Sequence, residues 1–286
     1  MFSKQTVAVH VKGMPVKVHL VSTGAVSVKT KFRDATKTGM LAMLDFMLDK
    51  TFTEWMPIWV MIIEHPEGFF VIDTGENANV NDKNYFKSSG FFANWFDTTQ
   101  FKFIVNKEEE IGPQLNDLQI PIEKIKAVVL THLHLDHIDG LKYFPSTEII
   151  VNKYEHDKPF GDLPKLYPSW FAPTLIELNQ QYEAFDKAFY LTKAKDLLMV
   201  HTPGHTYGHC SIVFNTDEGC IFFGADICYS QQQLINEKYS GTNASHKLAQ
   251  KTYAAVTAFA KEHKTIFIPS HEAAAAERLK TLTPVF

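Results

Sequence analysis

The sequence contains little cysteine. Only three cysteines occur in 286 residues, and they stand at Cys210, Cys220 and Cys228 without the spacing of a CxxC motif. An odd number of cysteines without that spacing fits reduced thiols better than a framework of disulfide bonds. We therefore expect a protein of the cytoplasm.

Long apolar runs are missing as well. A membrane-spanning helix needs roughly 18 uninterrupted apolar residues, and the nearest run, residues 58–63, has only the length of a strand. The N-terminal residues contain neither a long apolar stretch nor a small-residue cleavage site, so no signal peptide is visible. We expect no membrane span.

The chain also lacks an excess of basic charge. It has 28 Lys and Arg against 32 Asp and Glu, a formal net charge of -4, and the basic residues are scattered along the sequence. Proteins that bind a nucleic-acid backbone gather cations to face the phosphates. Nucleic acid is therefore not expected as a partner.

What the sequence does contain is an apolar content of 45%, enough for a substantial core. No low-complexity linker divides the chain, so we expect a single α/β domain over residues 1–286, built from two packed sheets with helices outside. Alternating apolar residues and turn signals predict strands at residues 7–11, 16–21, 58–64, 69–73, 127–130, 148–151, 197–200, 210–214, 220–223 and 265–268. Helices are predicted at residues 39–49, 138–144 and 245–262, and a surface loop at residues 153–173.

Polar residues crowd directly behind the predicted strand at residues 127–130. The stretch THLHLDHIDG, residues 131–140, holds three histidines and two aspartates. In extended backbone, residues two apart point to the same side, so His132 and His134 can approach one ion together. A helix that begins at residue 138 would place Asp136 and His137 at its first turn, facing the same cavity.

Three further polar residues follow other predicted strands. His205 comes after residues 197–200, Asp226 after residues 220–223 and His271 after residues 265–268. Sites in α/β proteins commonly lie just past the ends of strands. Together with the first stretch this makes five histidines and two aspartates, which suits a pair of divalent ions, with Zn as the default and Fe, Mn or Co as alternatives.

These motifs resemble those of the metallo-β-lactamase superfamily from about residue 56 to residue 272. THLHLDHIDG matches its HxHxDH motif, TPGHTYGH its glycine-histidine turn, FFGADI its bridging aspartate, IPSHE its last histidine and VIDTG its early strand-end signature. The resemblance implies an αβ/βα four-layer sandwich of two mixed β-sheets with helices on the outer faces. It also implies a first metal held by His132, His134 and His205, a second held by Asp136, His137 and His271, and Asp226 as a ligand of both.

Departures from other branches of the superfamily argue against the functions of those branches. Class B β-lactamases with a zinc pair carry Cys where Asp226 stands, flavodiiron proteins carry Glu where His134 stands, and glyoxalase II has a longer C-terminal region than follows His271. Tyr229, three residues after Asp226, and the approach MPIWVMIIEHPEGFFVIDTG resemble the N-acyl homoserine lactone lactonases, which quench quorum sensing.

This resemblance implies a mechanism. A hydroxide bridging the two metals would attack the lactone carbonyl, with Tyr229 and the second metal stabilising the oxyanion and Asp136 carrying a proton to the leaving ring oxygen. The alternatives are hydrolysis of phosphotriesters or arylesters at the same metals, hydrolysis of short unacylated lactones, and a non-catalytic metal-stabilised binding protein.

Two apolar segments, residues 38–56 and 85–103, are rich in Met and Phe. An acyl lactone needs an apolar groove, and Met surfaces adapt to varied apolar ligands. We expect these segments to line the acyl chain or to form a homodimer contact, with core packing as the simpler alternative. The residues expected to bind the acyl chain are Met40, Met43, Met47, Phe91 and Phe92. Asp73 and His209 are expected to support the metal ligands without binding the metals.

Overall fold

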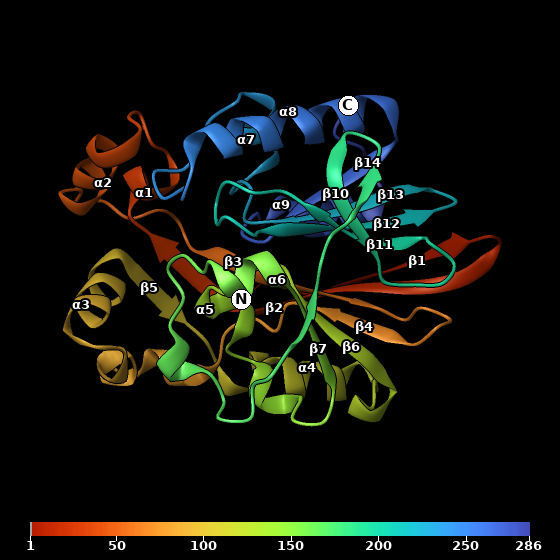
Figure 1. Cartoon of the computed structure of the whole chain (residues 1–286). Coiled ribbons are helices and arrows are strands. Elements are labelled where there is room, and N and C mark those ends of the chain that lie inside the picture. Colours follow the sequence, from red (N-terminus) through yellow and green to blue (C-terminus); the bar gives the residue numbers. More distant parts are fainter. Residues whose placement is uncertain (1) are drawn as a thin grey trace.

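Two mixed β-sheets, packed face to face, form the centre of the fold (Figure 1). The computed structural model describes residues 2–286. The first sheet has the order β1-β2-β3-β4-β6-β7-β8, with β5 pairing with β2, and the second has the order β14-β13-β12-β11-β10-β9. The first sheet consists of β1 (Gln5–Val11), β2 (Met14–Val28), β3 (Met56–Ile63), β4 (Phe69–Ile72), β5 (Phe101–Ile104), β6 (Ile125–Leu130), β7 (Glu148–Asn152) and β8 (Thr174–Ile176). The second consists of β9 (Gln180–Tyr182), β10 (Phe185–Tyr190), β11 (Leu197–His201), β12 (Cys210–Thr216), β13 (Gly219–Ala225) and β14 (Thr265–Pro269).

The largest apolar cluster lies between the two sheets. Trp59 and Val129 of the first sheet belong to it together with Ile212 and Phe223 of the second, and all four are at most 1% exposed. Burial of each such side chain contributes about 1.5–3 kcal/mol. The alternation of apolar residues in these strands therefore orients one face of each sheet toward the other.

Helices cover the outer faces of both sheets, which completes four layers (Figure 1). On the second sheet, Tyr253, Val256 and Phe259 of α8 pack against Phe222 and Phe267. The helices are α1 (Thr30–Arg33), α2 (Gly39–Met47), α3 (Phe91–Gln100), α4 (Ile111–Asp117), α5 (Leu135–Ile138), α6 (Lys153–Asp157), α7 (Gln231–Ile235), α8 (His246–Glu262) and α9 (Ala274–Thr281). Short 3-10 turns occupy Ala78–Asn81, Tyr85–Ser89, Lys107–Glu109, Ile122–Lys124, Leu141–Tyr143 and Pro164–Leu166. Within residues 2–286, no helix has both the length and the apolar character to cross a membrane.

The prediction of a helix at residues 138–144 is wrong. Helix α5 begins at Leu135 and ends at Ile138, and a separate 3-10 turn follows at Leu141–Tyr143. The interruption falls at Gly140, where a Cβ atom would collide with the Thr74 carbonyl and where the backbone N–H donates to Gly75 O at 3.2 Å. The end of the histidine-rich stretch therefore contacts the residues that directly follow β4.

The segment at residues 153–173 is not the uninterrupted loop predicted from its prolines. It begins with α6, whose N-cap Asn152 accepts a hydrogen bond from Tyr154 N at 3.2 Å, and it contains the turn Pro164–Leu166. The predicted strand positions correspond to strands of the structure, and α2 and α8 occupy the predicted ranges 39–49 and 245–262 with shorter ends. Ser245 is the N-cap of α8 and accepts from Leu248 N at 3.3 Å.

Candidate metal centre

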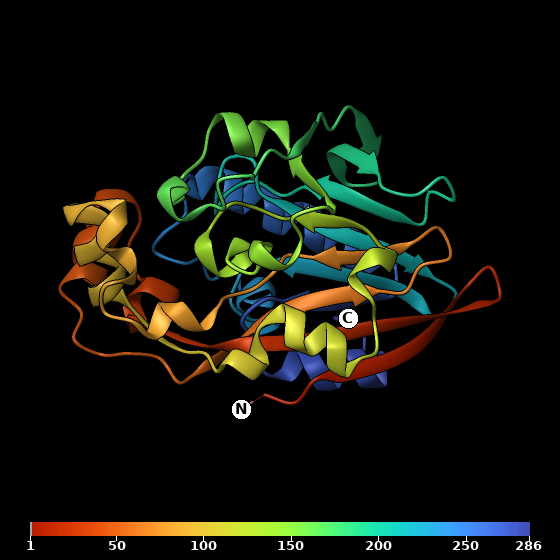
Figure 2. The same cartoon turned by 90° about the horizontal axis from the view of Figure 1, so that it is seen from below.

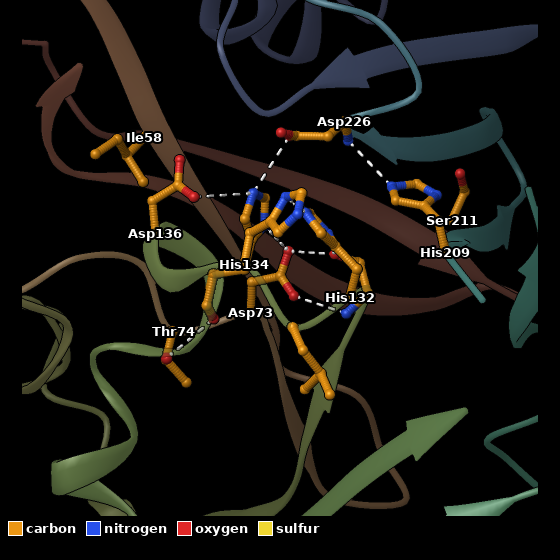
Figure 3. A network of polar contacts seen from close by, with 12 residues as sticks. Ile58, Asp73, Thr74, His132, His134, Asp136, His209, Ser211 and Asp226 are labelled. Carbon is orange, nitrogen blue, oxygen red and sulfur yellow. Dashed lines mark hydrogen bonds and ion pairs between the residues drawn. The ribbon is translucent and has the colours of Figure 1, made fainter. Parts of the chain in front are cut away.

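The loops that follow β6, β11, β13 and β14 meet at one edge of the two sheets. They bring together the seven residues that the sequence motifs single out, as donors of three overlapping groups whose ligand atoms lie within 4.8 Å of one another. Figure 3 shows His132, His134, Asp136 and Asp226 converging, with Asp73 and His209 next to them. The first group is His132, His134 and His205, the second group is Asp136, His137 and His271, and a third set, His132, His137 and Asp226, connects them.

In the first group, three imidazole nitrogens face one another. His134 Nδ1 lies 3.0 Å from His132 Nε2 and 2.8 Å from His205 Nε2. His134 Nε2 donates to Phe160 O at 2.7 Å, which leaves Nδ1 with a free lone pair. Burial, and then the neighbouring histidines, hold the pKa values of His132 and His205 well below the usual range. Neutral imidazoles that point their lone pairs at one spot fit a divalent cation.

In the second group, two histidines are turned so that their Nε2 atoms face Asp136. His137 Nδ1 donates to Asp73 at 2.7 Å, and His271 Nδ1 donates to Pro57 O at 2.9 Å. The Nε2 atom of His271 lies 3.4 Å from an Asp136 oxygen, and that of His137 lies 3.8 Å from the other oxygen. In a metal-binding histidine, one ring N–H usually donates to a fixed acceptor, and the second ring nitrogen is left free to bind the metal.

Asp226 lies between the two groups. Its Oδ1 atom is 3.3 Å from Nε2 of both His137 and His271, and its Oδ2 atom is 3.5 Å from His205 Nε2. Burial alone would raise the pKa of Asp226, but the charges on His271 and His137 hold it well below its usual range. The carboxylate is therefore ionised and faces both groups.

The donor set fits two divalent cations. Among residues 2–286, the buried atoms His137 Nε2 and Asp226 Oδ1 have no hydrogen-bond partner, although each faces the space between the groups. A buried polar atom without a partner costs about 1–3 kcal/mol, and coordination to a cation removes that cost. Nitrogen and carboxylate oxygen are donors that Zn, Fe, Mn and Co accept.

Asp73 and His209 form hydrogen bonds with two of the candidate metal-binding residues, His137 and Asp226. The Asp73 carboxylate accepts from Thr131 N and Thr131 Oγ1, both at 2.8 Å, in addition to His137. His209 Nε2 accepts from Asp226 N at 3.2 Å, while its Nδ1 donates to Thr202 O at 3.1 Å. Burial lowers the pKa of His209 to about 3, so this imidazole is neutral.

Glu155, which the sequence patterns do not mark, joins the two loops of the first group. Its side chain is buried and accepts from Leu133 N at 3.2 Å, from Gly208 N at 3.1 Å and from Thr206 Oγ1 at 2.7 Å. Leu133 lies between two histidines of the group, and Thr206 follows the third. Asn152, the N-cap residue of α6, is the local signal for the turn that carries Glu155.

Tyr229 lies over the second group. Its ring stacks on the ring of His271 with centroids 5.6 Å apart, and only 8% of the residue is exposed. Tyr229 and His271 line a cavity of about 370 Å³, together with Arg33, Trp55 and Glu272. The tyrosine is therefore placed between the second donor group and a space that can hold a small molecule.

Trp55 also lines a second cavity, of about 660 Å³. Its wall includes Phe86, Phe101, Phe103 and Asp97. Asp97, another residue that the sequence patterns miss, has a half-buried carboxyl group, and burial together with the charge of Asp136 raises its pKa to about 7.

Within residues 2–286, the structure brings none of the five predicted acyl-binding residues to the walls of these two cavities. Met40 is 74% exposed, Phe91 87% and Phe92 72%, and in the described part of the chain neither they nor Met43 line either cavity. Met47 is half-buried against the apolar cluster that contains Tyr229.

Comparison with known proteins identifies similar sequences and folds. The family model described as "Metallo-beta-lactamase superfamily" matches residues 53–271. An N-acyl homoserine lactonase from Bacillus sp is 27% identical over 184 residues, which cover 64% of this chain and 68% of that protein. The structure of an N-acyl homoserine lactone hydrolase with the product N-hexanoyl-L-homoserine at its catalytic metal centre matches with a TM-score of 0.73 and 18% identity, covering 92% of this chain and 95% of that one. The dizinc quorum-quenching lactonase AidC matches with a TM-score of 0.63 and 16% identity, over 95% and 91% of the two chains.

Proposed function

The chain belongs to the metallo-β-lactamase superfamily, and from that premise we propose that it is a dinuclear metal-dependent hydrolase that opens the lactone ring of N-acyl homoserine lactones. The observation that carries the proposal is the position of Asp226, whose two oxygens face both histidine groups next to Tyr229. The names of similar proteins, N-acyl homoserine lactonases, support the choice of substrate.

We assign His132, His134 and His205 to the first metal. The second metal is assigned to Asp136, His137 and His271, and Asp226 is shared by both. Zinc is the proposed metal, because four-coordinate zinc sites favour histidine and carboxylate donors, and Fe, Mn or Co could occupy the same donors. Two bound divalent cations would supply a water of lowered pKa and would polarise the carbonyl group of the substrate.

The Tyr229 hydroxyl is assigned to the substrate carbonyl oxygen. Burial, followed by the charges of Asp226 and Asp136, raises the pKa of Tyr229 well above its usual value, so the hydroxyl keeps its proton at neutral pH. A donor fixed next to the oxygen on which negative charge develops lowers the barrier to ester cleavage. Stacking on His271 fixes the ring in that position.

Asp136 is assigned a second role besides metal binding. Its side chain is 19% exposed, more than that of His137 or His271, and it lies at the rim of the second group. A carboxylate in this position can take the proton released when water attacks and deliver it to the ring oxygen that leaves. The products are then an alcohol and a carboxylate of the opened N-acyl homoserine.

The two cavities suggest how the substrate lies. The lactone head fits the cavity of about 370 Å³ beside Tyr229, and the acyl chain passes Trp55 toward the aromatic wall of the cavity of about 660 Å³. Met47 packs against the apolar cluster that contains Tyr229, and its contact with the acyl chain stays a prediction. Acyl-chain binding by Met40, Met43, Phe91 and Phe92 stays a prediction. A single domain over residues 1–286 and a cytoplasmic location are further proposals.

A substrate panel combined with metal analysis tests the proposal. The panel contains N-acyl homoserine lactones of several chain lengths, simple γ-lactones, a paraoxon-like triester and nitrocefin. We expect the highest kcat/KM for the N-acyl homoserine lactones, two metal ions per chain, and loss of activity in EDTA that is reversed by adding metal. Robust turnover of the triester without turnover of lactones would overturn the assignment of substrate but not the assignment of the metal centre.

A further inference from the structure

Helix α2 is apolar on nearly every side, yet only one stripe of it is buried. Of its sequence GMLAMLDFM, only Ala42 and Phe46 are buried. Met40 is 74% exposed, Leu41 64%, and Leu48, which follows the helix, 79%. A helix that is hydrophobic all round is normally covered on all sides. This helix is covered by its own chain on one side only.

Helix α3 lies beside α2 at the same end of the molecule and extends this apolar region (Figures 1 and 2). The two helices contact each other through Phe46 and Phe96, whose ring centroids are 6.2 Å apart. We call the exposed apolar side chains of the two helices the α2–α3 surface. It consists of Met40, Leu41, Met43, Leu44, Leu48, Phe91, Phe92 and Trp95.

The α2–α3 surface is larger than an isolated protein usually exposes. At about 150–250 Å² for a large side chain, the exposed fractions of its eight residues, from 37% to 87%, amount to on the order of 1,000 Å². The largest apolar patch of a typical monomer covers about 300–600 Å². Each partner in a standard protein interface buries about 800 Å². The area therefore corresponds to one half of a stable dimer interface.

The charges around the surface indicate what covers it. Asp45 is the one charged residue within α2, and its carboxylate is bound by Lys31 at 2.9 Å and Lys37 at 3.1 Å. Lys29 and Lys102 lie over the ring of Phe52, at 4.0 and 3.9 Å from its centroid.

An anionic lipid surface attracts proteins through an excess of unpaired basic residues. Here two of the nearby cations are already paired with Asp45, and the whole chain has a net charge of -4. A surface rich in Met, Phe and Trp and poor in charge is typical of the centre of a protein–protein interface. Both observations favour a protein partner over a membrane.

We propose that two copies of this chain pair through the α2–α3 surface. In a symmetric dimer the same patch lies on both sides of the two-fold axis, so an apolar surface whose one charged residue within α2, Asp45, is already paired with two lysines is complementary to itself. The inner side of the two helices packs in the cluster that contains Phe32, Met56 and Tyr229. The dimer contact would thus support the wall on which Tyr229 rests. The proposal does not depend on the identity of the substrate.

The experiment measures the mass of the metal-loaded full chain by sedimentation velocity at several concentrations. We expect the wild type to be a dimer at micromolar concentrations, and the double variant Leu44→Glu, Phe92→Glu to be a monomer with unchanged metal content. The substituted positions are 49% and 72% exposed, so the fold should tolerate the change. Met14→Glu is the matched control, because Met14 is 49% exposed on β2, outside the α2–α3 surface, and this variant should remain a dimer.

Three results would overturn the proposal. The first is a wild type that stays monomeric at tens of micromolar, and the second is a double variant that dimerises as strongly as the wild type. The third is a monomeric wild type that sediments with phosphatidylglycerol vesicles while the double variant does not, because the surface would then bind lipid. The activity of the wild type towards lactones is measured in parallel. Its absence would count only against the proposed function.

Discussion

His137 Nδ1 donates a hydrogen bond of 2.7 Å to the carboxylate of Asp73, and each of these side chains is only 1% exposed. The same carboxylate accepts from Thr131 N and Thr131 Oγ1. Asp73 adopts a φ of 61°, a left-handed conformation that few residues other than glycine take up. Its three hydrogen bonds stabilise that conformation, and they leave His137 Nε2 facing Asp136 and Asp226.

Replacing Asp73 with Asn should weaken the second metal site. The amide offers one oxygen where the carboxylate offers two, so His137 loses its acceptor and can change tautomer, which places a proton on Nε2. Removal of such a supporting group typically lowers metal affinity by about 10–100-fold. Competition titration with a chromophoric chelator should show one ion bound as in the wild type and a second bound more weakly. Two ions of unchanged affinity would contradict the role given to Asp73.

The complementary prediction concerns Glu155→Gln and the first metal site. The Gln side chain has one acceptor oxygen, so either Leu133 N or the pair Thr206 Oγ1 and Gly208 N loses its partner. The loop that carries His132 and His134 should then move relative to the loop that carries His205. We expect the same chelator titration to show a weakened first ion and an unchanged second ion.

Glu110→Gln is the matched control for Glu155→Gln. Glu110 is also a buried carboxylate that accepts from a backbone N–H, that of Ala78 at 3.0 Å, and it belongs to none of the metal groups. This variant should lose stability in urea while keeping both ions. If Glu155→Gln behaves in the same way as the control, Glu155 supports only the fold.

The grouping of the candidate metal-binding residues could be predicted from the sequence for a physical reason that does not extend to the rest of the site. His132, His134, Asp136 and His137 stand within six residues at the end of an apolar strand, so local spacing alone brings them together. Glu155 meets its partners at sequence separations of 22 to 53 residues, and no local pattern encodes such a meeting.

The Met- and Phe-rich segments show a second limit of the sequence. Their periodicity predicts α2 and indicates an apolar surface, but the same pattern is expected whether the surface faces the core, a ligand or another molecule. In the structure most of this surface is exposed to solvent, as Leu48 at 79% and Phe91 at 87% show. Packing between distant elements decides which side chains are covered, and the spacing of apolar residues does not encode it.

Asp97 should make the stability of the metal-free protein depend on pH. Its pKa is raised to about 7 from 3.8, first by burial and then by the charge of Asp136. Between pH 4 and pH 7 the folded chain therefore holds a proton that the unfolded chain releases. The unfolded state binds fewer protons in this window, so this group lowers the free energy of unfolding as the pH rises.

The variant Asp97→Asn tests this dependence because it cannot ionise. We expect its free energy of unfolding, measured in urea with EDTA, to rise relative to the wild type when the pH is changed from 5 to 8. In the metal-loaded protein the same comparison should give a smaller change, because bound cations offset the charge of Asp136. A difference between variant and wild type that does not change with pH would show that Asp97 is ionised throughout this range in the folded chain.

Replacing Tyr229 with Phe should slow lactone hydrolysis without removing the metals. The ring can keep its stacking on His271, at 5.6 Å between centroids, while the hydroxyl that we assign to the substrate carbonyl is lost. Loss of one donor to a developing oxyanion typically lowers kcat by about 100–1,000-fold, so we expect a fall of that order in kcat with little change in KM. Tyr182→Phe is the control, because its hydroxyl bonds Asn215 at 3.2 Å, outside the metal groups, and it should leave kcat unchanged. Loss of metal in Tyr229→Phe, or an equal fall in both variants, would mean that Tyr229 supports the site and does not contact the substrate.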